Sequence, residues 1–328
     1  MAIMYKRSNV IPMVCNSITV SAPGSMMLFG EHAVLESHLA IAMAIDTRLT
    51  VKIQPRKDLN IQINSSLGQH QTNLNSLSIK KPFEFILAAI NHFQSQLQQG
   101  MDIFVETSFS HTKGFGSSAA ITVATVAALN YLLTQSQNKE DIFLTSRTII
   151  QHVQGRGSGT DALASTMGTI VTYQMQPLSY QVLPISLPIS LIYCGYKTPT
   201  TEVIKKVNAF KQLNPKQSQQ IFLDMHQISQ QAVLALSKND LKQLGKLMQA
   251  HQACQKMLGV SDLVSEKIIQ HVKHYPVFGA KISGSGLGDC IAVLGNLPEN
   301  SFPCASLNQT EQMTIQTAQQ GVIIHDAC

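Results

Sequence analysis

A short glycine-containing stretch has the residue types of a phosphate-binding loop. It consists of Lys113, Gly114, Phe115, Gly116, Ser117, Ser118, Ala119 and Ala120, and it leads into a small-residue, apolar segment. Glycine adopts backbone angles closed to other residues, so successive amides can point into one concavity at the positive end of a helix dipole. The serine hydroxyls add ligands for a phosphate oxygen or a bound Mg²⁺. The same pattern also fits an ordinary loop with an N-capping serine, and by itself it leaves both interpretations open.

Two further segments combine glycines with polar residues. In the segment 22–34, Ser25 follows a Pro-Gly turn, and Glu31 and His32 follow Gly30. The Glu-His pair could orient a substrate hydroxyl or form a surface ion pair. The segment 281–290 has glycines at alternate positions, which permit close backbone approach to a ligand or to another loop.

Length, composition and charge exclude several classes of protein. The 328 residues predict two domains or one large one, and 44% hydrophobic with 13% charged residues argues against disorder. A net charge of +5 without a basic cluster argues against nucleic-acid binding and suits a small anionic substrate. Six scattered cysteines predict free thiols in a reducing compartment. Without a signal sequence or 18 consecutive uncharged apolar residues, we expect a cytoplasmic protein without a membrane anchor.

Hydrophobic periodicity predicts the elements that position these segments. Strands are expected over 18–22, 48–54, 59–63, 102–107, 169–174, 281–283 and 290–294, with 48–54 and 59–63 forming a hairpin and 64–79 a loop. Helices are expected over 82–100, 118–133, 138–155, 201–212, 217–237, 239–258 and 262–274. The Pro-rich stretch 177–188 predicts a domain boundary, with domains at 1–185 and 186–328.

The order of three motifs resembles the GHMP superfamily of small-molecule kinases, and within it the mevalonate kinases. The motifs are Phe-Gly-Glu-His-Ala-Val at 29–34, Gly-Phe-Gly-Ser-Ser-Ala-Ala at 114–120 and Ser-Gly-Ser-Gly-Leu-Gly at 283–288. The resemblance implies an α/β and α+β two-domain fold. Its N-terminal nucleotide-binding domain is related to a ribosomal protein, and its C-terminal domain is ferredoxin-like. ATP and a small alcohol would meet between the domains, and Mg²⁺ would bridge the phosphates.

The resemblance also implies roles for individual residues. Asp161, in the segment 155–168, matches the catalytic aspartate that accepts the proton of the substrate hydroxyl, although it could instead cap a helix. Residues 113–119 would bind the nucleotide, with Ser118 also binding Mg²⁺. The substrate would contact Glu31, His32, Ser25, Thr198, Gly284 and Ser285. Thr198 also fits a turn or an N-cap.

Departures from the family pattern keep other functions open. Ser25 stands where mevalonate kinases usually have a lysine, and Ile150 stands at the position of a Mg²⁺-binding glutamate. Arg156 or Lys113 could replace the lost positive charge, and Gln151 or Glu31 could assist Ser118 at the metal. The sequence Gly288-Asp289-Cys290, where many mevalonate kinases have another glycine, is more similar to the phosphomevalonate kinases. The alternatives are therefore a kinase for phosphomevalonate or another alcohol, and a weakened nucleotide-binding relative. The protein could form a homodimer. The lack of a clustered basic face argues against an RNA-associated module.

Overall fold

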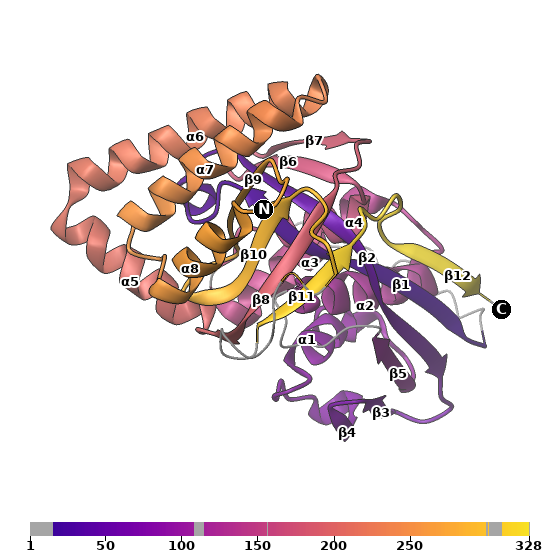
Figure 1. The fold of residues 1–328 in the computed structure, drawn as a ribbon. Coiled ribbons are helices and arrows are strands. Elements are labelled where there is room, and N and C mark those ends of the chain that lie inside the picture. Colours follow the sequence, from indigo (N-terminus) through magenta and orange to yellow (C-terminus); the bar gives the residue numbers. More distant parts are fainter. Residues whose placement is uncertain (1–15, 108–114, 156, 300, 302–309, 328) are drawn as a thin grey trace.

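The computed structural model describes residues 16–107, 115–155, 157–299, 301 and 310–327. They form two β-sheets with helices packed against each (Figure 1). The helices are α1 (Glu84–Phe93), α2 (Ser117–Thr134), α3 (Lys139–Gln154), α4 (Thr160–Met167), α5 (Thr200–Leu213), α6 (Pro215–Ser237), α7 (Leu241–Met257) and α8 (Leu263–Val272), with short 3₁₀ turns at Ala33–Glu36, Leu74–Ser76 and Gln94–Gln96. The strands are β1 (Ile18–Phe29), β2 (Ala40–Pro55), β3 (Asn60–Ser65), β4 (Gly68–Asn73), β5 (Met101–Thr107), β6 (Ile170–Gln174), β7 (Ser179–Leu183), β8 (Ile189–Lys197), β9 (Gly279–Ser283), β10 (Gly288–Leu294), β11 (Glu311–Ile315) and β12 (Ile323–Ala327).

The larger sheet corrects one expectation from the sequence. Its strand order is β12-β1-β2-β5-β3-β4, and β6 joins β2 to β7. Because β5 lies between β2 and β3, the predicted hairpin of 48–54 with 59–63 is wrong. Instead β3 pairs in parallel with β5 and antiparallel with β4. The stretch 64–79, predicted as a loop, contains β4 and a 3₁₀ turn.

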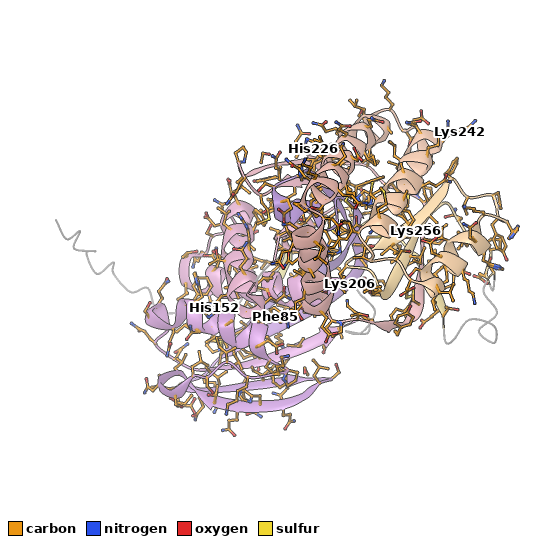
Figure 2. All side chains as sticks on the ribbon, turned by 90° about the vertical axis from the view of Figure 1, so that its left-hand side faces the viewer. Phe85, His152, Lys206, His226, Lys242 and Lys256 are labelled. Carbon is orange, nitrogen blue, oxygen red and sulfur yellow. The ribbon has the colours of Figure 1, made fainter. Side chains whose placement is uncertain are left out.

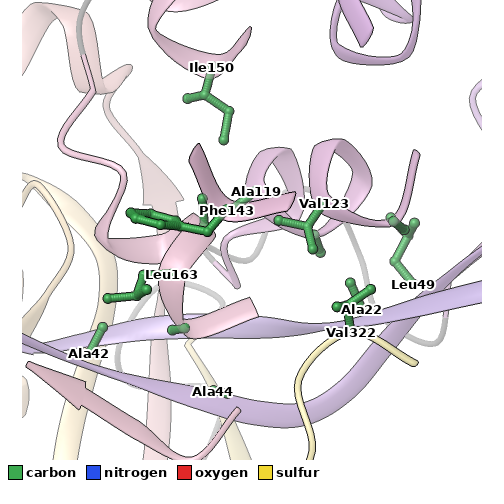
Figure 3. Packing of buried hydrophobic residues seen from close by; sticks show 14 of the residues in the cluster. Ala22, Ala42, Ala44, Leu49, Ala119, Val123, Phe143, Ile150, Leu163 and Val322 are labelled. Carbon is green, nitrogen blue, oxygen red and sulfur yellow. The ribbon is translucent and has the colours of Figure 1, made fainter. Parts of the chain in front are cut away.

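Helix α2 is the centre of the helical layer on this sheet. Eleven of its 18 residues are buried, and it contacts β1, β2, α1, α3 and α4. Small side chains on both surfaces, such as Ala119 of α2 and Ala22 and Ala42 of the strands, leave room for close packing (Figure 3). By length and composition this helix could cross a membrane, which the sequence did not predict. Its burial in the core instead identifies it as a central packing helix.

The second sheet is antiparallel, with the order β11-β8-β10-β9. Helices α7 and α8 pack against it, and α6 contacts both α5 and α7 (Figure 1). The four predicted helices of this half and the strands β9 and β10 are confirmed, as is the two-domain fold class. The last strand, β12, returns to pair with β1 of the first sheet. The boundary at residue 185 stays a prediction.

Candidate active site

The glycine stretch leads into α2 through a left-handed residue. Gly116 has φ 64° and is the N-cap of the helix, without a side-chain cap. A Cβ at this position would lie 2.1 Å from Ser25 Oγ, so only glycine fits there. The amides of Ala119 and Ala120 donate to Gly116 O. The amides of Ser117 and Ser118 come first in the helix, where no preceding turn provides an acceptor. The start of α2 can therefore receive an anion at the amides of Ser117 and Ser118.

Asp161 lies next to this helix start. Ser25 Oγ, which adjoins Gly116, donates a hydrogen bond of 2.9 Å to Asp161 Oδ1. Asp161 is the second residue of α4 and makes no capping bond, because Gly159 is the N-cap. Burial raises the pKa of Asp161, while the Ser25 hydrogen bond and the charge of Lys197 lower it. A carboxylate with a raised pKa, beside an anion-binding helix start, is suited to accept a proton from a hydroxyl.

Two cavities meet at the start of α2. One, of about 260 Å³, has Asp161, Ser25 and Lys197 in its wall, together with Gly284, Ser285 and Asp289. The other, of about 270 Å³, is lined mainly by apolar side chains of α1, β2, β5 and α2. Ser117 and Ser118 line both. A ligand with an apolar ring and a charged tail could therefore occupy both cavities across the helix start.

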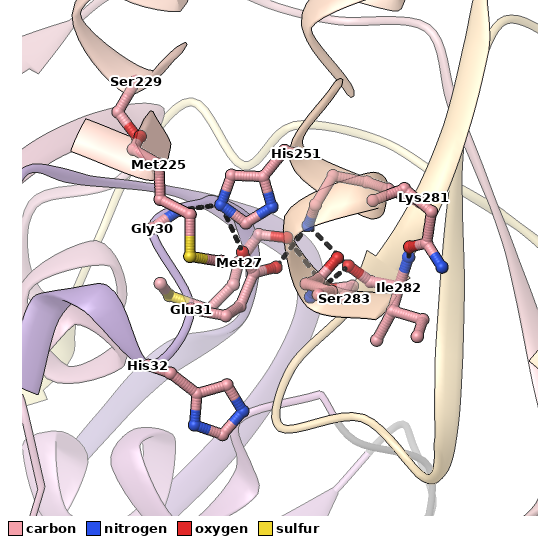
Figure 4. Close-up of polar contacts among 12 residues, drawn as sticks. Met27, Gly30, Glu31, His32, Met225, Ser229, His251, Lys281, Ile282 and Ser283 are labelled. Carbon is pink, nitrogen blue, oxygen red and sulfur yellow. Dashed lines mark hydrogen bonds and ion pairs between the residues drawn. The ribbon is translucent and has the colours of Figure 1, made fainter. Parts of the chain in front are cut away.

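Glu31 and His32 are buried, so they do not form a surface ion pair. The fully buried Lys281 Nζ of β9 donates to Glu31 Oε1 and to Ile282 O (Figure 4). His32 Nε2 donates to Ser285 O at 2.8 Å. These contacts connect the end of β1 to the second sheet. Glu31 thus adjoins the cavity but is held by Lys281.

His251 of α7 completes this network as a neutral ring. Its Nε2 accepts a hydrogen bond of 2.9 Å from the Gly30 amide (Figure 4). Burial, and then the charge of Lys281, hold the pKa of His251 well below its ordinary 6.5. The 3.6 Å approach of Nε2 to Glu31 Oε2 is therefore not an ion pair.

The stability of the protein should fall as the pH drops below about 6.5. Unfolded His251 takes up a proton there while the folded ring stays neutral, so its contribution is complete above the ordinary pKa and is lost below it. We expect a loss of about 1.4 kcal/mol per pH unit from this group. Urea unfolding at pH 7.5 and 5.5 measures it. His251→Gln, which cannot titrate, should show a smaller pH effect than the wild type, and equal effects would contradict this assignment.

The structure brings most predicted site residues together. Around the cavity lie Ser25, Glu31, His32, Gly116, Ser117, Ser118, Ala119, Asp161, Gly284 and Ser285, while Phe115 O accepts the amide of Ser25. Thr198 is not in the cavity wall. Its hydroxyl donates to Leu287 O at 2.7 Å, and Thr200 lines the cavity instead. Lys113, Gly114 and Arg156 lie outside the described residues.

Sequence reasoning missed Lys197 as a cavity residue. It is the last residue of β8, and its Nζ lies 2.9 Å from Asp289 Oδ2. The signal available was a charged residue at the end of an apolar strand, shortly before a predicted helix. Sequence reasoning also missed the partners of Glu31, since Lys281 is 250 positions away.

Family models match both halves of the chain. The model described as the GHMP kinases N-terminal domain matches residues 84–169, and the GHMP kinases C-terminal model matches 232–301. The chain is 31% identical to a mevalonate kinase of Archaeoglobus fulgidus over 287 residues, which is 86% of this chain and 94% of the relative. It is 26% identical to a mevalonate kinase of Saccharolobus solfataricus over 280 residues, covering 84% and 88% of the two chains.

Solved structures share the fold at lower identity. The L. major mevalonate kinase in complex with R-mevalonate has a TM-score of 0.78 at 22% identity, covering 94% of this chain and 98% of the other. The phosphomevalonate kinase of Streptococcus pneumoniae has a TM-score of 0.75 at 17% identity, covering 90% and 99%. These likenesses concern the fold alone, and both kinases are built on it.

Proposed function

This chain belongs to the GHMP kinases, within them to the mevalonate kinase family, and from that premise we propose that it transfers the γ-phosphoryl group of ATP to the hydroxyl group of mevalonate. The observation that carries the proposal is the contact of Ser25 with both Gly116 and Asp161. That contact puts an anion-binding helix start beside a carboxylate with a raised pKa. Phosphoryl transfer to an alcohol needs these two functions side by side.

The residues act by alignment and proton transfer. The hydroxyl oxygen of mevalonate attacks the γ-phosphorus, its proton passes to an Asp161 carboxylate oxygen, and the bond from the γ-phosphorus to the bridging oxygen breaks to release ADP. Ser25 fixes Asp161 by donating to Oδ1. The start of α2 holds the negative phosphates. Most of the acceleration comes from this positioning and from charge stabilisation, since no covalent intermediate with the protein is required.

The nucleotide is proposed to span both cavities. Its base occupies the mainly apolar cavity, against side chains such as Phe83, Ile86 and Ile121. Its phosphates extend past Ser117 and Ser118, which line both cavities, toward Asp161. Burial of the flat base in this cavity is favourable, and the positive end of the helix dipole attracts the negatively charged phosphates.

The charges around the acceptor cavity favour mevalonate over phosphomevalonate. Lys197 is the one lysine or arginine among the described residues that line it, and Asp289 already pairs with this ammonium. Asp161 adds a further carboxylate, and Glu31 is neutralised by Lys281. The phosphate group that phosphomevalonate already carries would need additional cations, which the described residues of this wall do not supply.

The described residues fit a weakly held magnesium ion. Ser118 can offer its hydroxyl, whereas Ile150 in the same cavity wall is apolar, Glu31 is held by Lys281, and Gln151 Nε2 donates to Gly157 O. Mg²⁺ keeps several waters and binds through substrate phosphates, so Ser118 would be one ligand beside phosphate and water oxygens. When bound, it would neutralise charge on the phosphates. The buried free thiols Cys194 and Cys254 support a reducing compartment such as the cytoplasm.

Ser118→Ala should raise the KM for Mg-ATP by about 10- to 100-fold, the loss expected from one hydrogen bond to a charged group. The KM for mevalonate should change little, because Ser118 lies at the phosphate end of the cavity. Steady-state ADP release at varied Mg-ATP measures the effect. Ser237→Ala, at the end of α6 and far along the chain from the cavities, is the control. An unchanged KM for Mg-ATP in Ser118→Ala would reject the assignment.

The proposed function is tested with a panel of acceptors. ADP release with Mg-ATP is measured against mevalonate, phosphomevalonate, homoserine and galactose. We expect turnover on mevalonate with the highest kcat/KM of the four. If the protein prefers another acceptor, it is instead a kinase for that acceptor. ATP binding without turnover on any of them would indicate a non-catalytic relative.

A further inference from the structure

The wall of the acceptor cavity holds a lysine in a fixed position. Lys197 ends β8 opposite Gly288 of β10, and its side chain is 35% exposed. Its Nζ lies 2.9 Å from Asp289 Oδ2, while the Asp289 side chain is only 6% exposed. Lys197 and Asp289 therefore both line the cavity, and the ammonium is held by a buried carboxylate.

The surrounding backbone is shaped for this pair. Asp289 adopts φ 68°, an uncommon conformation for a residue other than glycine. A Cβ on Gly284 would lie 3.1 Å from Asp289 Oδ2, so the glycine leaves the carboxylate its space. Without Lys197, the buried Asp289 carboxylate would lack its cation, which is costly, so Asp289 holds the Lys197 ammonium firmly.

Phosphoryl transfer beside Asp161 is favoured by a fixed positive charge from the protein, which Ser25 cannot supply. The γ-phosphoryl group and the carboxylate are both negative, and the Ser25 hydroxyl contributes only a hydrogen bond. The cavity wall contains no other lysine or arginine among the described residues. Fixed positive charge at such a site stabilises the transition state.

We propose that Lys197, held by Asp289, is the cation of the phosphoryl-transfer site, and that it stabilises negative charge on the transferring phosphoryl group and on Asp161. This inference rests on the proposed function. Lys197 thus supplies the positive charge that the sequence analysis assigned to Lys113 or Arg156.

Four variants test this role, and Lys113→Met and Arg156→Met are measured beside them for comparison. Lys197→Met removes the charge at similar length, and Lys197→Arg keeps it. The double variant Lys197→Met/Asp289→Asn removes both charges of the pair, so its net charge is unchanged. Lys206→Met, on the exposed side of α5 (Figure 2), is the matched control. For each variant, kcat and KM are measured across pH with the acceptor that the wild type prefers.

We expect Lys197→Met to lower kcat by about 10²-fold or more, the loss typical of one electrostatic group at a transition state. Lys197→Arg should retain most of the activity, and the double variant should be as slow as Lys197→Met. If the double variant regains wild-type activity, Lys197 only neutralises Asp289 and the proposal is overturned. A smaller loss in Lys197→Met than in Lys113→Met or Arg156→Met also overturns it.

The pH profile separates a charge effect from a structural one. Burial raises the pKa of Asp161, Ser25 and Lys197 lower it, and Asp289 and Glu31 raise it further. Lys197→Met should therefore move the acidic limb of kcat/KM to higher pH, and an unmoved limb contradicts the proposal. If the wild type turns over no acceptor, the proposed function fails separately. Titration of the Asp161 carboxyl by NMR, assigned with Asp161→Asn, then decides whether Lys197 acts on it.

Discussion

Asp161→Asn should lower kcat for mevalonate by about 10²- to 10⁴-fold, the contribution typical of a positioned general base. Asparagine keeps the size of the side chain, and its oxygen can still accept from Ser25. It cannot take the hydroxyl proton. Steady-state ADP release measures the loss, and calorimetry with a non-hydrolysable ATP analogue should give an almost unchanged affinity, since the start of α2 is intact.

Asp141→Asn provides the control for this substitution. Asp141 is exposed in the first turn of α3 and has no place in either cavity. Its replacement should leave kcat within the error of the measurement. Turnover that survives in Asp161→Asn would reject Asp161 as the base while leaving the family membership untouched.

Local patterns predicted helices better than sheet order. Helix α2 was identifiable because apolar residues occur on nearly every face, which only a buried helix tolerates. By contrast β2 and β3 alternate similarly, and the insertion of β5 between them depends on pairing over about 40 to 60 positions. Strand β4 has the polar sequence Gly-Gln-His-Gln-Thr-Asn at the sheet edge, so no apolar alternation marked it.

The candidate site was predictable where its residues lie in one motif. Ser117, Ser118 and Asp161 came from contiguous segments and line the expected cavity. Contacts across the two sheets were not predictable, because Lys281 and Lys197 become partners of Glu31 and Asp289 only when the chain folds. The placement of Thr198 was not predictable for a related reason. Its hydroxyl bonds to Leu287 O, 89 positions away, whereas Thr200 at the start of α5 lines the cavity.

The buried pair of Glu31 and Lys281 should matter more for stability than any surface ion pair. The side chains are 2% and 0% exposed, and they join the end of β1 to β9. Lys281→Met leaves the Glu31 carboxylate buried without its cation. Removal of one partner from such a pair costs about 3–5 kcal/mol, so we expect a loss of that size in the free energy of unfolding. Urea unfolding at pH 7.5 measures it.

Two further variants identify the cause of that loss. Lys256→Met removes a cation that is 66% exposed and pairs with Glu266 at 3.3 Å, and it should cost at most about 1 kcal/mol. Glu31→Gln/Lys281→Met removes both buried charges and should recover part of the stability lost in Lys281→Met, because no carboxylate is then left unpaired. A double variant less stable than Lys281→Met would show that packing of the lysine stem, rather than charge pairing, holds β1 to β9.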